Sequence, residues 1–245
     1  CIPLLKREDI RKEAEPLVNE IGTLSGSTVM YHELFTNHIS YFRFLFDLKE
    51  VPEELFSYIG ILKAVLGYVD TEVHSYDELF HEINMETGGI TAVTNLFTNA
   101  KNLEECRVTF EIKAKTLEDN LAKATQLAQE IMLQSRFDDE KRLYEILAEL
   151  KSHLQSALIS AGHSVAAGRA MSYFSRPAAI QERLSGMPFY RLVDDLEKNF
   201  DSRKDELKEK LNRLVRCIFR PENLLLDYIG TREHYEEFLR LAEGV

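Results

Sequence analysis

The nearest approach to a metal-binding pattern in the 245-residue chain is Glu78-Leu79-Phe80-His81, an E-x-x-H spacing. On a helix this spacing places a carboxylate and an imidazole one turn apart, as in half of a carboxylate-bridged di-iron site. His74 lies one further turn back on the same face. A complete site needs several such helices, and no second E-x-x-H is placed to face this one. We therefore interpret the pattern as the solvated acidic end of a helix.

Zinc-peptidase motifs are incomplete in this chain. His32-Glu33 and His81-Glu82 both begin H-E-x-x-H, but Thr36 and Met85 occupy the position of the second histidine. The inverted motif H-x-x-E-H does not occur either. The sequence therefore predicts no catalytic residue and no metal-ligating residue within these 245 residues, and no cofactor bound by them.

The three cysteines, Cys1, Cys106 and Cys217, are far apart and match no metal-ligand spacing. Cys106 opens a strand pattern, and Cys217 lies on the apolar stripe of a helix, where a thiol behaves as a small hydrophobic group. We expect reduced, buried cysteines in a cytoplasmic protein.

A second polar cluster lies in a segment of small residues. His163 and Arg169 stand among glycines and alanines, and Ser160, Ser164 and Gly168 recur at four-residue intervals. A stripe of small residues lets helices cross closely. No Ser, Cys or Asp arrangement accompanies the imidazole, so we interpret His163 as a hydrogen-bonded packing residue and not as an acid or base.

Composition excludes two classes of partner. The chain has 41 Asp and Glu against 30 Lys and Arg, a net charge of -11. A nucleic-acid binder needs a surplus of basic residues, so no nucleic acid is expected. No apolar run reaches the roughly 18 residues of a membrane span, and there is no signal-peptide pattern, so no membrane is expected. The acidic balance would attract basic peptides, but it is also an ordinary means of staying soluble.

Hydrophobic periodicity predicts an α+β fold, with a mostly antiparallel sheet covered by helices on one face. Phe42, Phe44 and Phe46 alternate along one strand, and residues 106–114 alternate apolar and polar. Strands are predicted at 28–33, 39–48, 90–97, 106–114 and 223–229, and helices at 52–68, from Ser75, through most of 117–218 and from Thr231. We expect a connector at 1–26 and one domain at 27–245. The first residue is Cys, so we expect the chain to be part of a longer polypeptide.

A double glycine directly follows the helix that Ser75 begins, and Ser75 with Glu78 forms a capping box. We predict that Gly88 takes the left-handed C-cap conformation. Gly89 then lets the next strand start close against its neighbour.

Four segments resemble the pitrilysin/insulinase superfamily of zinc peptidases, and most closely its presequence-protease branch. They are P-L-L-K-R-E-D-I (Pro3 to Ile10), E-T-G-G-I (Glu86 to Ile90), A-G-H-S-V-A-A-G-R-A (Ala161 to Ala170) and E-R-L-S-G-M (Glu182 to Met187). The motif residues that we single out are Gly88, Gly89, Gly162, His163, Arg169 and Gly186.

The resemblance implies a full-length zinc metalloendopeptidase of the inverted H-x-x-E-H type, which degrades unfolded peptides inside a clamshell of four related α+β domains. Only the first domain of such enzymes holds zinc. This chain would be the third domain, which opens the C-terminal half and forms part of the chamber wall beside the N-terminal catalytic half. The zinc helix would correspond here to Leu55–Val69, which offers Tyr58, Ile59, Leu62 and Lys63 instead of ligands.

An alternative is a peptidase-like structural or interaction subunit that cleaves nothing. An H-x-x-E-H in the sequence that precedes Cys1 would distinguish the enzyme from this subunit. The sequence assigns no residue to contacts with a peptide in the chamber.

Overall fold

The computed structural model describes residues 4–10, 12–13, 16 and 18–244. Its centre is a six-stranded sheet with the order β1-β2-β6-β3-β5-β4. The strands are β1 (Glu20–Leu24), β2 (Ser27–Glu33), β3 (Ile39–Asp47), β4 (Ile90–Asn99), β5 (Asn102–Leu117) and β6 (Leu224–Gly230). Neighbouring strands are antiparallel except β2 and β6, which run parallel.

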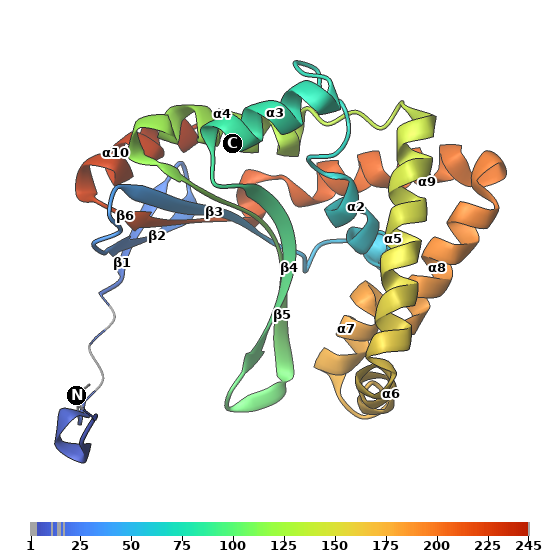
Figure 1. Ribbon diagram of the computed structural model, residues 1–245, viewed down its shortest axis with the longest axis horizontal. Coiled ribbons are helices and arrows are strands. Elements are labelled where there is room, and N and C mark those ends of the chain that lie inside the picture. The colour runs from blue at the N-terminus through green and yellow to red at the C-terminus, as the bar shows by residue number, and fades with distance from the viewer. Residues whose placement is uncertain (1–3, 11, 14–15, 17, 245) are drawn as a thin grey trace.

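One face of the sheet is the core face. Phe42, Phe44 and Phe46 alternate along β3 and are almost completely buried. Phe238 of α10 (Arg232–Ala242) packs on Phe42 and Phe44 with ring centroids 5.3 and 5.9 Å apart. Helices α4 (Leu121–Leu133) and α10 lie over this face (Figure 1). The predicted α+β architecture is confirmed.

The other face carries no helix of the described chain over it in Figure 1. Strands β4 and β5 bend away from the rest of the sheet, so this face is concave (Figure 1). We call it the concave face, and its residues alternate with those of the core face. Tyr41 and Arg43 of β3 belong to it.

The remaining helices are α1 (Glu53–Phe56), α2 (Ile59–Val65), α3 (Tyr76–Glu86), α5 (Glu140–Ser160), α6 (Gly162–Met171), α7 (Arg176–Ser185), α8 (Met187–Lys198) and α9 (Phe200–Ile218), with short 3-10 turns at Arg7–Asp9, Glu118–Asn120 and Pro221–Asn223. The capping box at the start of α3 is confirmed: Ser75 N donates to Glu78 Oε2 at 3.0 Å and Ser75 Oγ accepts from Glu78 N. The last helix follows Thr231 as predicted.

The predicted single helix over 52–68 is wrong, because the chain turns between α1 and α2. Tyr58 N donates to the Leu55 carbonyl oxygen at 2.9 Å, which tightens the chain into a turn. This turn buries Leu55, Tyr58 and Ile59 together. Burial of these side chains outweighs the continuation of one regular helix.

Two further differences from the sequence predictions concern the N-terminal segment and the thiols. Strand β1 lies inside the segment predicted as a connector and pairs with β2, for instance Gly22 with Val29. Cys106 and Cys217 are free, as predicted, but they are only half-buried, so the predicted burial is wrong. Cys1 lies outside the described residues. Among the described helices, none has the length and apolar character needed to cross a bilayer.

Candidate functional site

The helix that should correspond to a zinc helix is filled with core residues. Ile59 and Leu62 of α2 are completely buried, and burial lowers the pKa of Lys63 beside them. Zinc requires imidazole, thiolate or carboxylate ligands that converge on one point. Neither the aliphatic side chains nor a lysine can supply them, so these residues do not fit a zinc ion. Across the described part of the chain, no group of three or more His, Cys, Asp or Glu side chains is placed to hold a metal.

Tyr58, at the turn before α2, belongs to an ion network with α9. Its hydroxyl donates to Glu206 Oε1 at 2.9 Å and accepts from Lys210 Nζ at 3.1 Å. Arg203 also donates to Glu206, and these bonds lower the pKa of the Glu206 carboxyl to about 2. The network fixes the turn between α1 and α2 against α9, which is a structural role.

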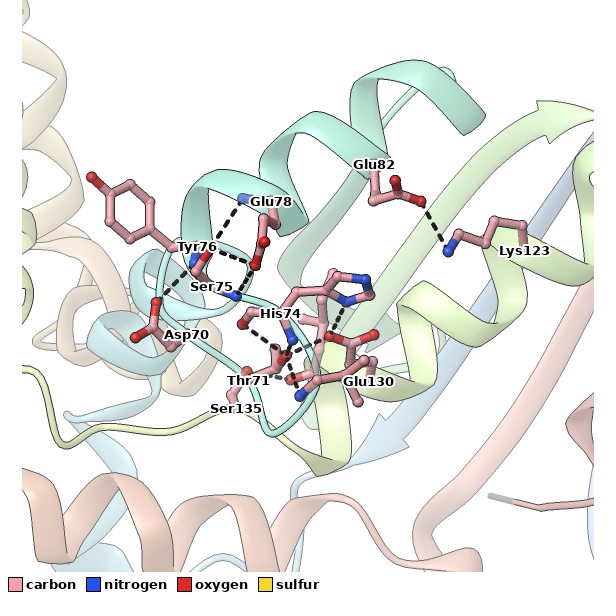
Figure 2. Close-up of polar contacts among 12 residues, drawn as sticks. Asp70, Thr71, His74, Ser75, Tyr76, Glu78, Glu82, Lys123, Glu130 and Ser135 are labelled. Carbon is pink, nitrogen blue, oxygen red and sulfur yellow. Dashed lines mark hydrogen bonds and ion pairs between the residues drawn. The ribbon is translucent and has the colours of Figure 1, made fainter.

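A hydroxyl, an imidazole and a carboxylate meet between α3 and α4 (Figure 2). His74 Nδ1 lies 2.8 Å from Glu130 Oε1, and the Thr71 hydroxyl contacts the same carboxylate oxygen. Glu130 and Thr71 are both buried. A hydroxyl, an imidazole and a carboxylate also make up the catalytic triad of many hydrolases.

The geometry does not fit nucleophilic catalysis. A hydroxyl nucleophile must hydrogen-bond the imidazole that removes its proton. Here Thr71 and His74 both contact Glu130 Oε1, and Thr71 Oγ1 instead accepts from the His74 backbone N–H at 2.8 Å. Thr71 and His74 give the buried Glu130 carboxylate two hydrogen-bond partners. They do not form a chain along which a proton could pass from the hydroxyl to the imidazole.

We call Thr71, His74 and Glu130 together the Glu130 lock. It holds the chain before α3 in contact with the end of α4. Thr71 forms a bridge with Ser135, and Glu72 N donates to the Gln134 carbonyl oxygen at 3.0 Å. Asp70 accepts from Tyr76 N at 2.8 Å and so joins the start of α3 (Figure 2). No local pattern signals the lock, because Thr71 and Glu130 lie 59 residues apart in the sequence.

Glu78 and His81, the two polar residues of the E-x-x-H pattern, do not act together. Glu78 caps α3 through Ser75, and His81 is exposed. Glu82, beside it, pairs with Lys123 of α4 at 2.9 Å (Figure 2). The predicted solvated helix end is therefore confirmed, while His74 turns away from this group into the Glu130 lock.

The roles predicted for the double glycine are reversed. Thr87, in extended conformation, is the C-cap of α3, and Gly89 rather than Gly88 has a positive φ of 118°. Gly88 instead provides the close approach: its N–H donates to the Lys115 carbonyl oxygen at 2.8 Å, and a Cβ there would lie 2.8 Å from Lys115 Cε. The helix ends at Glu86, so the left-handed residue falls further along the chain than predicted.

The small-residue motif forms α6, in which no residue is buried. The prediction that His163 is a packing residue is wrong, because its side chain is exposed. Gly162 opens the helix, and an added Cβ would meet nothing within 4 Å. These two motif residues have no structural requirement within the described chain.

Arg169 and Gly186, from two separate motifs, meet at Glu182 of α7. Arg169 Nη1 lies 3.5 Å from Glu182 Oε2, whose side chain is buried. A Cβ on Gly186 would lie 2.8 Å from the Glu182 Cα, so only glycine fits between α7 and α8 here. The structure thus brings the A-G-H-S-V and E-R-L-S-G-M segments together through one carboxylate.

The concave face carries a second group of polar side chains. Arg43 Nη2 lies 2.6 Å from Asp227 Oδ2, and His32 Nε2 lies 3.0 Å from Asp227 Oδ1. The latter contact becomes a hydrogen bond only when Nε2 carries a proton. His32 Nδ1 also lies 2.7 Å from Asn19 Oδ1. The buried carboxylate thus joins β6 to β3 and β2.

A hollow of about 580 Å³ lies on the concave face next to the double glycine. Tyr41, Arg43, Thr91, Lys113 and Lys115 line it. Sequence reasoning did not single out the two lysines, although the period of two along β5 places both on the face that it leaves to solvent. Asp227 of β6, the ion-pair partner of Arg43, lines the hollow as well.

Comparisons with known proteins agree with the sequence resemblance. The family model for "Peptidase M-16C associated" matches residues 1–196. Protein HypA of Clostridium perfringens is 35% identical over 237 residues, which cover 97% of this chain and 24% of HypA. The mitochondrial presequence protease of Danio rerio is 28% identical, over 91% of this chain and 22% of its own length. Presequence protease 1 of Arabidopsis thaliana, chloroplastic/mitochondrial, is 24% identical, over 89% of this chain and 20% of its own.

The chain therefore spans less than a quarter of the length of these relatives. The resemblance to the presequence-protease branch of the pitrilysin/insulinase peptidases is confirmed. Because the family model covers most of the sequence, the chain belongs to this peptidase-associated family.

Proposed function

We propose that this chain is a non-catalytic domain of a larger zinc metalloendopeptidase of the inverted H-x-x-E-H type, which degrades unfolded peptides. The zinc and its ligands would lie in an N-terminal catalytic half of the same polypeptide. The present domain, the third of four, would form part of the wall of the chamber that encloses the peptide. The domain by itself is inactive under this proposal.

The observation that carries the proposal is the state of α2. Ile59 and Leu62 of this helix are core residues, and Lys63, which follows them, is half-buried. None of these three side chains is a zinc ligand. A zinc site at this place would require both removal of core volume and exclusion of a cation. Core residues at this place are what we expect of a domain that takes no part in zinc binding.

The concave face suits a chamber wall. Its sheet surface is curved and lies opposite the face that the helices cover (Figure 1), and Arg43, Lys113 and Lys115 line a hollow on it. An extended peptide can lie along such a surface without opening the core. We infer that this face, and not the helical side, is turned toward the peptide.

The opposite end of the molecule suits contact with the rest of the polypeptide. Beside α6, the side chains of Ile159, Tyr173 and Phe174 are 86%, 75% and 78% exposed. Clustered exposed apolar side chains mark interaction surfaces. HypA, of which this chain covers 24%, is about four times as long, so we infer that the N-terminal half of the polypeptide covers this surface.

Metal analysis and peptide hydrolysis test the proposal. We expect one zinc ion in the full-length protein and chelator-sensitive cleavage of an unstructured fluorogenic peptide. The 245-residue chain should retain no stoichiometric zinc after dialysis and should cleave nothing. Bound zinc with turnover in this chain alone would contradict the proposal.

The same experiment separates the enzyme from a peptidase-like interaction subunit. A full-length protein without zinc and without turnover would favour the non-catalytic subunit. A cytoplasmic location also stays a prediction, which cell fractionation tests.

A further inference from the structure

The hollow beside Gly88 and Gly89 is an assembled feature of the fold. Register places Arg43 of β3 directly opposite Lys113 of β5, and Tyr41 opposite Lys115. On the other side of β5, Thr91 of β4 is also opposite Lys113. Three cationic side chains and two hydroxyls from three neighbouring strands therefore share one hollow of about 580 Å³.

The positive charge in this hollow is only partly compensated. Arg43 pairs with Asp227 at 2.6 Å. Within the described part of the chain, no carboxylate lies within 4.0 Å of the ammonium group of Lys113 or Lys115. Glu111, the next residue on this face of β5, is buried and accepts from the Thr109 hydroxyl at 2.6 Å. Among the described residues, two lysines thus stay without an acidic partner in a chain whose net charge is -11.

The cations of the hollow lie on neighbouring strands. Arg43 and Lys113 are directly opposite each other on antiparallel strands, and Asp227 offsets the charge of Arg43 but not that of Lys113. Gly88 leaves room for the Lys115 side chain, because a Cβ on residue 88 would lie 2.8 Å from Lys115 Cε. The charges of Lys113 and Lys115 are therefore the ones that can attract an anionic ligand.

We propose that this hollow binds the carboxylate of an Asp or Glu side chain in an extended peptide. The inference rests on the proposed function, since the peptide is the one enclosed in the chamber. The ammonium groups of Lys113 and Lys115 supply the charge, and the hydroxyls of Tyr41 and Thr91 supply neutral donors. Tyr41 and Ile229 add apolar surface for the neighbouring part of the peptide.

A peptide carboxylate is the anion that this surface fits best. The hollow is lined by residues of four neighbouring strands, β3, β4, β5 and β6, so an extended chain that lies across the concave face can reach it. A nucleic acid would meet an overall charge of -11, which disfavours phosphate polymers. The acidic character of the whole chain therefore does not extend to this part of the proposed wall.

Binding measurements on the 245-residue chain test the inference directly. The probes are a fluorescent unstructured peptide with two glutamates and the same peptide with glutamines. The test variant is Lys113→Glu with Lys115→Glu, and the control is Lys101→Glu with Lys141→Glu, which changes the net charge equally at exposed positions. We expect the test variant to weaken binding of the glutamate peptide about tenfold and the control to change it less than about twofold. Lys113→Gln with Lys115→Gln provides a milder variant if charge reversal impairs folding.

Three results would overturn the inference. Equal losses in the test and control variants would mean that only bulk charge matters. Equal binding of the glutamate and glutamine peptides would show that no carboxylate is recognised. Competition by inorganic phosphate as strong as competition by the glutamate peptide would show a general anion site.

Kinetics on the full-length protein separate this inference from the proposed function. If the protein cleaves peptides but the test variant leaves KM for the glutamate peptide unchanged, the inference fails and the proposed function stands. If the full-length protein binds no zinc and cleaves nothing, the proposed function fails, whatever the binding result.

Discussion

Helices α4 and α6 are of similar size but differ in what holds them. Leu121, Leu127 and Ile131 of α4 are buried at helical spacing against the sheet, and its Glu130 forms the lock with Thr71 and His74. In α6 no residue is buried, and glycines occupy positions 162 and 168. Isolated helices of this length are marginal in water, since most helical stability comes from tertiary packing. The difference indicates that α4 stabilises this domain, whereas α6 presents a surface.

The largest expected effect comes from removing core volume in α4. Leu127→Ala should lower the free energy of unfolding by about 2–5 kcal/mol, because Leu127 is completely buried and the cavity cannot fully collapse. The matched change in α6, Val165→Ala, should alter it by less than about 0.5 kcal/mol. Urea unfolding of both variants measures the contrast. Similar losses in the two variants would remove the distinction between the helices.

The Glu130 lock should contribute the next largest effect. Glu130→Ala leaves the Thr71 hydroxyl and the His74 ring without their common partner, which should cost about 1–3 kcal/mol. The corresponding ion pair of α6 is longer and more exposed, so Arg169→Ala should cost less than about 1 kcal/mol. Denaturant titration at neutral pH compares them. A larger loss for Arg169→Ala would show that α6 is more firmly held than its burial suggests.

A smaller effect is expected from the acid titration of the network around α1, α2 and α9. Arg203 and Lys210 lower the pKa of Glu206 from 4.5 to about 2 in the folded chain. A lowered folded-state pKa means that the contribution is complete above pH 4.5 and is lost as the pH falls toward 2. Glu206 is more than a third exposed, so the contribution should stay below about 1 kcal/mol.

Urea unfolding from about pH 6 to about pH 3 checks this titration. The wild-type chain should lose slightly more stability over this range than Glu206→Gln, which cannot titrate at that position. Parallel pH profiles for the two proteins would show that the network contributes nothing measurable.

The smallest free energies concern local opening of α6. Its amides should exchange with solvent almost without protection in the 245-residue chain, whereas α4 should exchange only through global unfolding. In the full-length protein, α6 should become protected if the remainder of the polypeptide covers it. Hydrogen exchange on both proteins measures this, and unchanged exchange in α6 would contradict its assignment as a contact surface.

Elements with a strong hydrophobic period could be predicted from the sequence. The alternation of Phe42, Phe44 and Phe46 placed β3, and the capping box of Ser75 and Glu78 placed the start of α3. The candidate site could be predicted only in part: the double glycine was singled out, but the hollow that it helps to form was not. The sequence pattern places Lys113 and Lys115 on the solvated side of a strand, and only the neighbouring strands show that no acid of the described chain compensates them.

By itself, the sequence determined the α+β class, the order of the main elements and the family, because periodicity and local motifs are properties of neighbouring residues. The tertiary structure decided which glycine takes the positive φ, where the helix over 52–68 breaks, and that α6 stays unburied. It also decided that Thr71, His74 and Glu130 meet. Each of these outcomes depends on a side chain or backbone group distant in the sequence, and a local pattern shows which face of an element is apolar but not what will cover it.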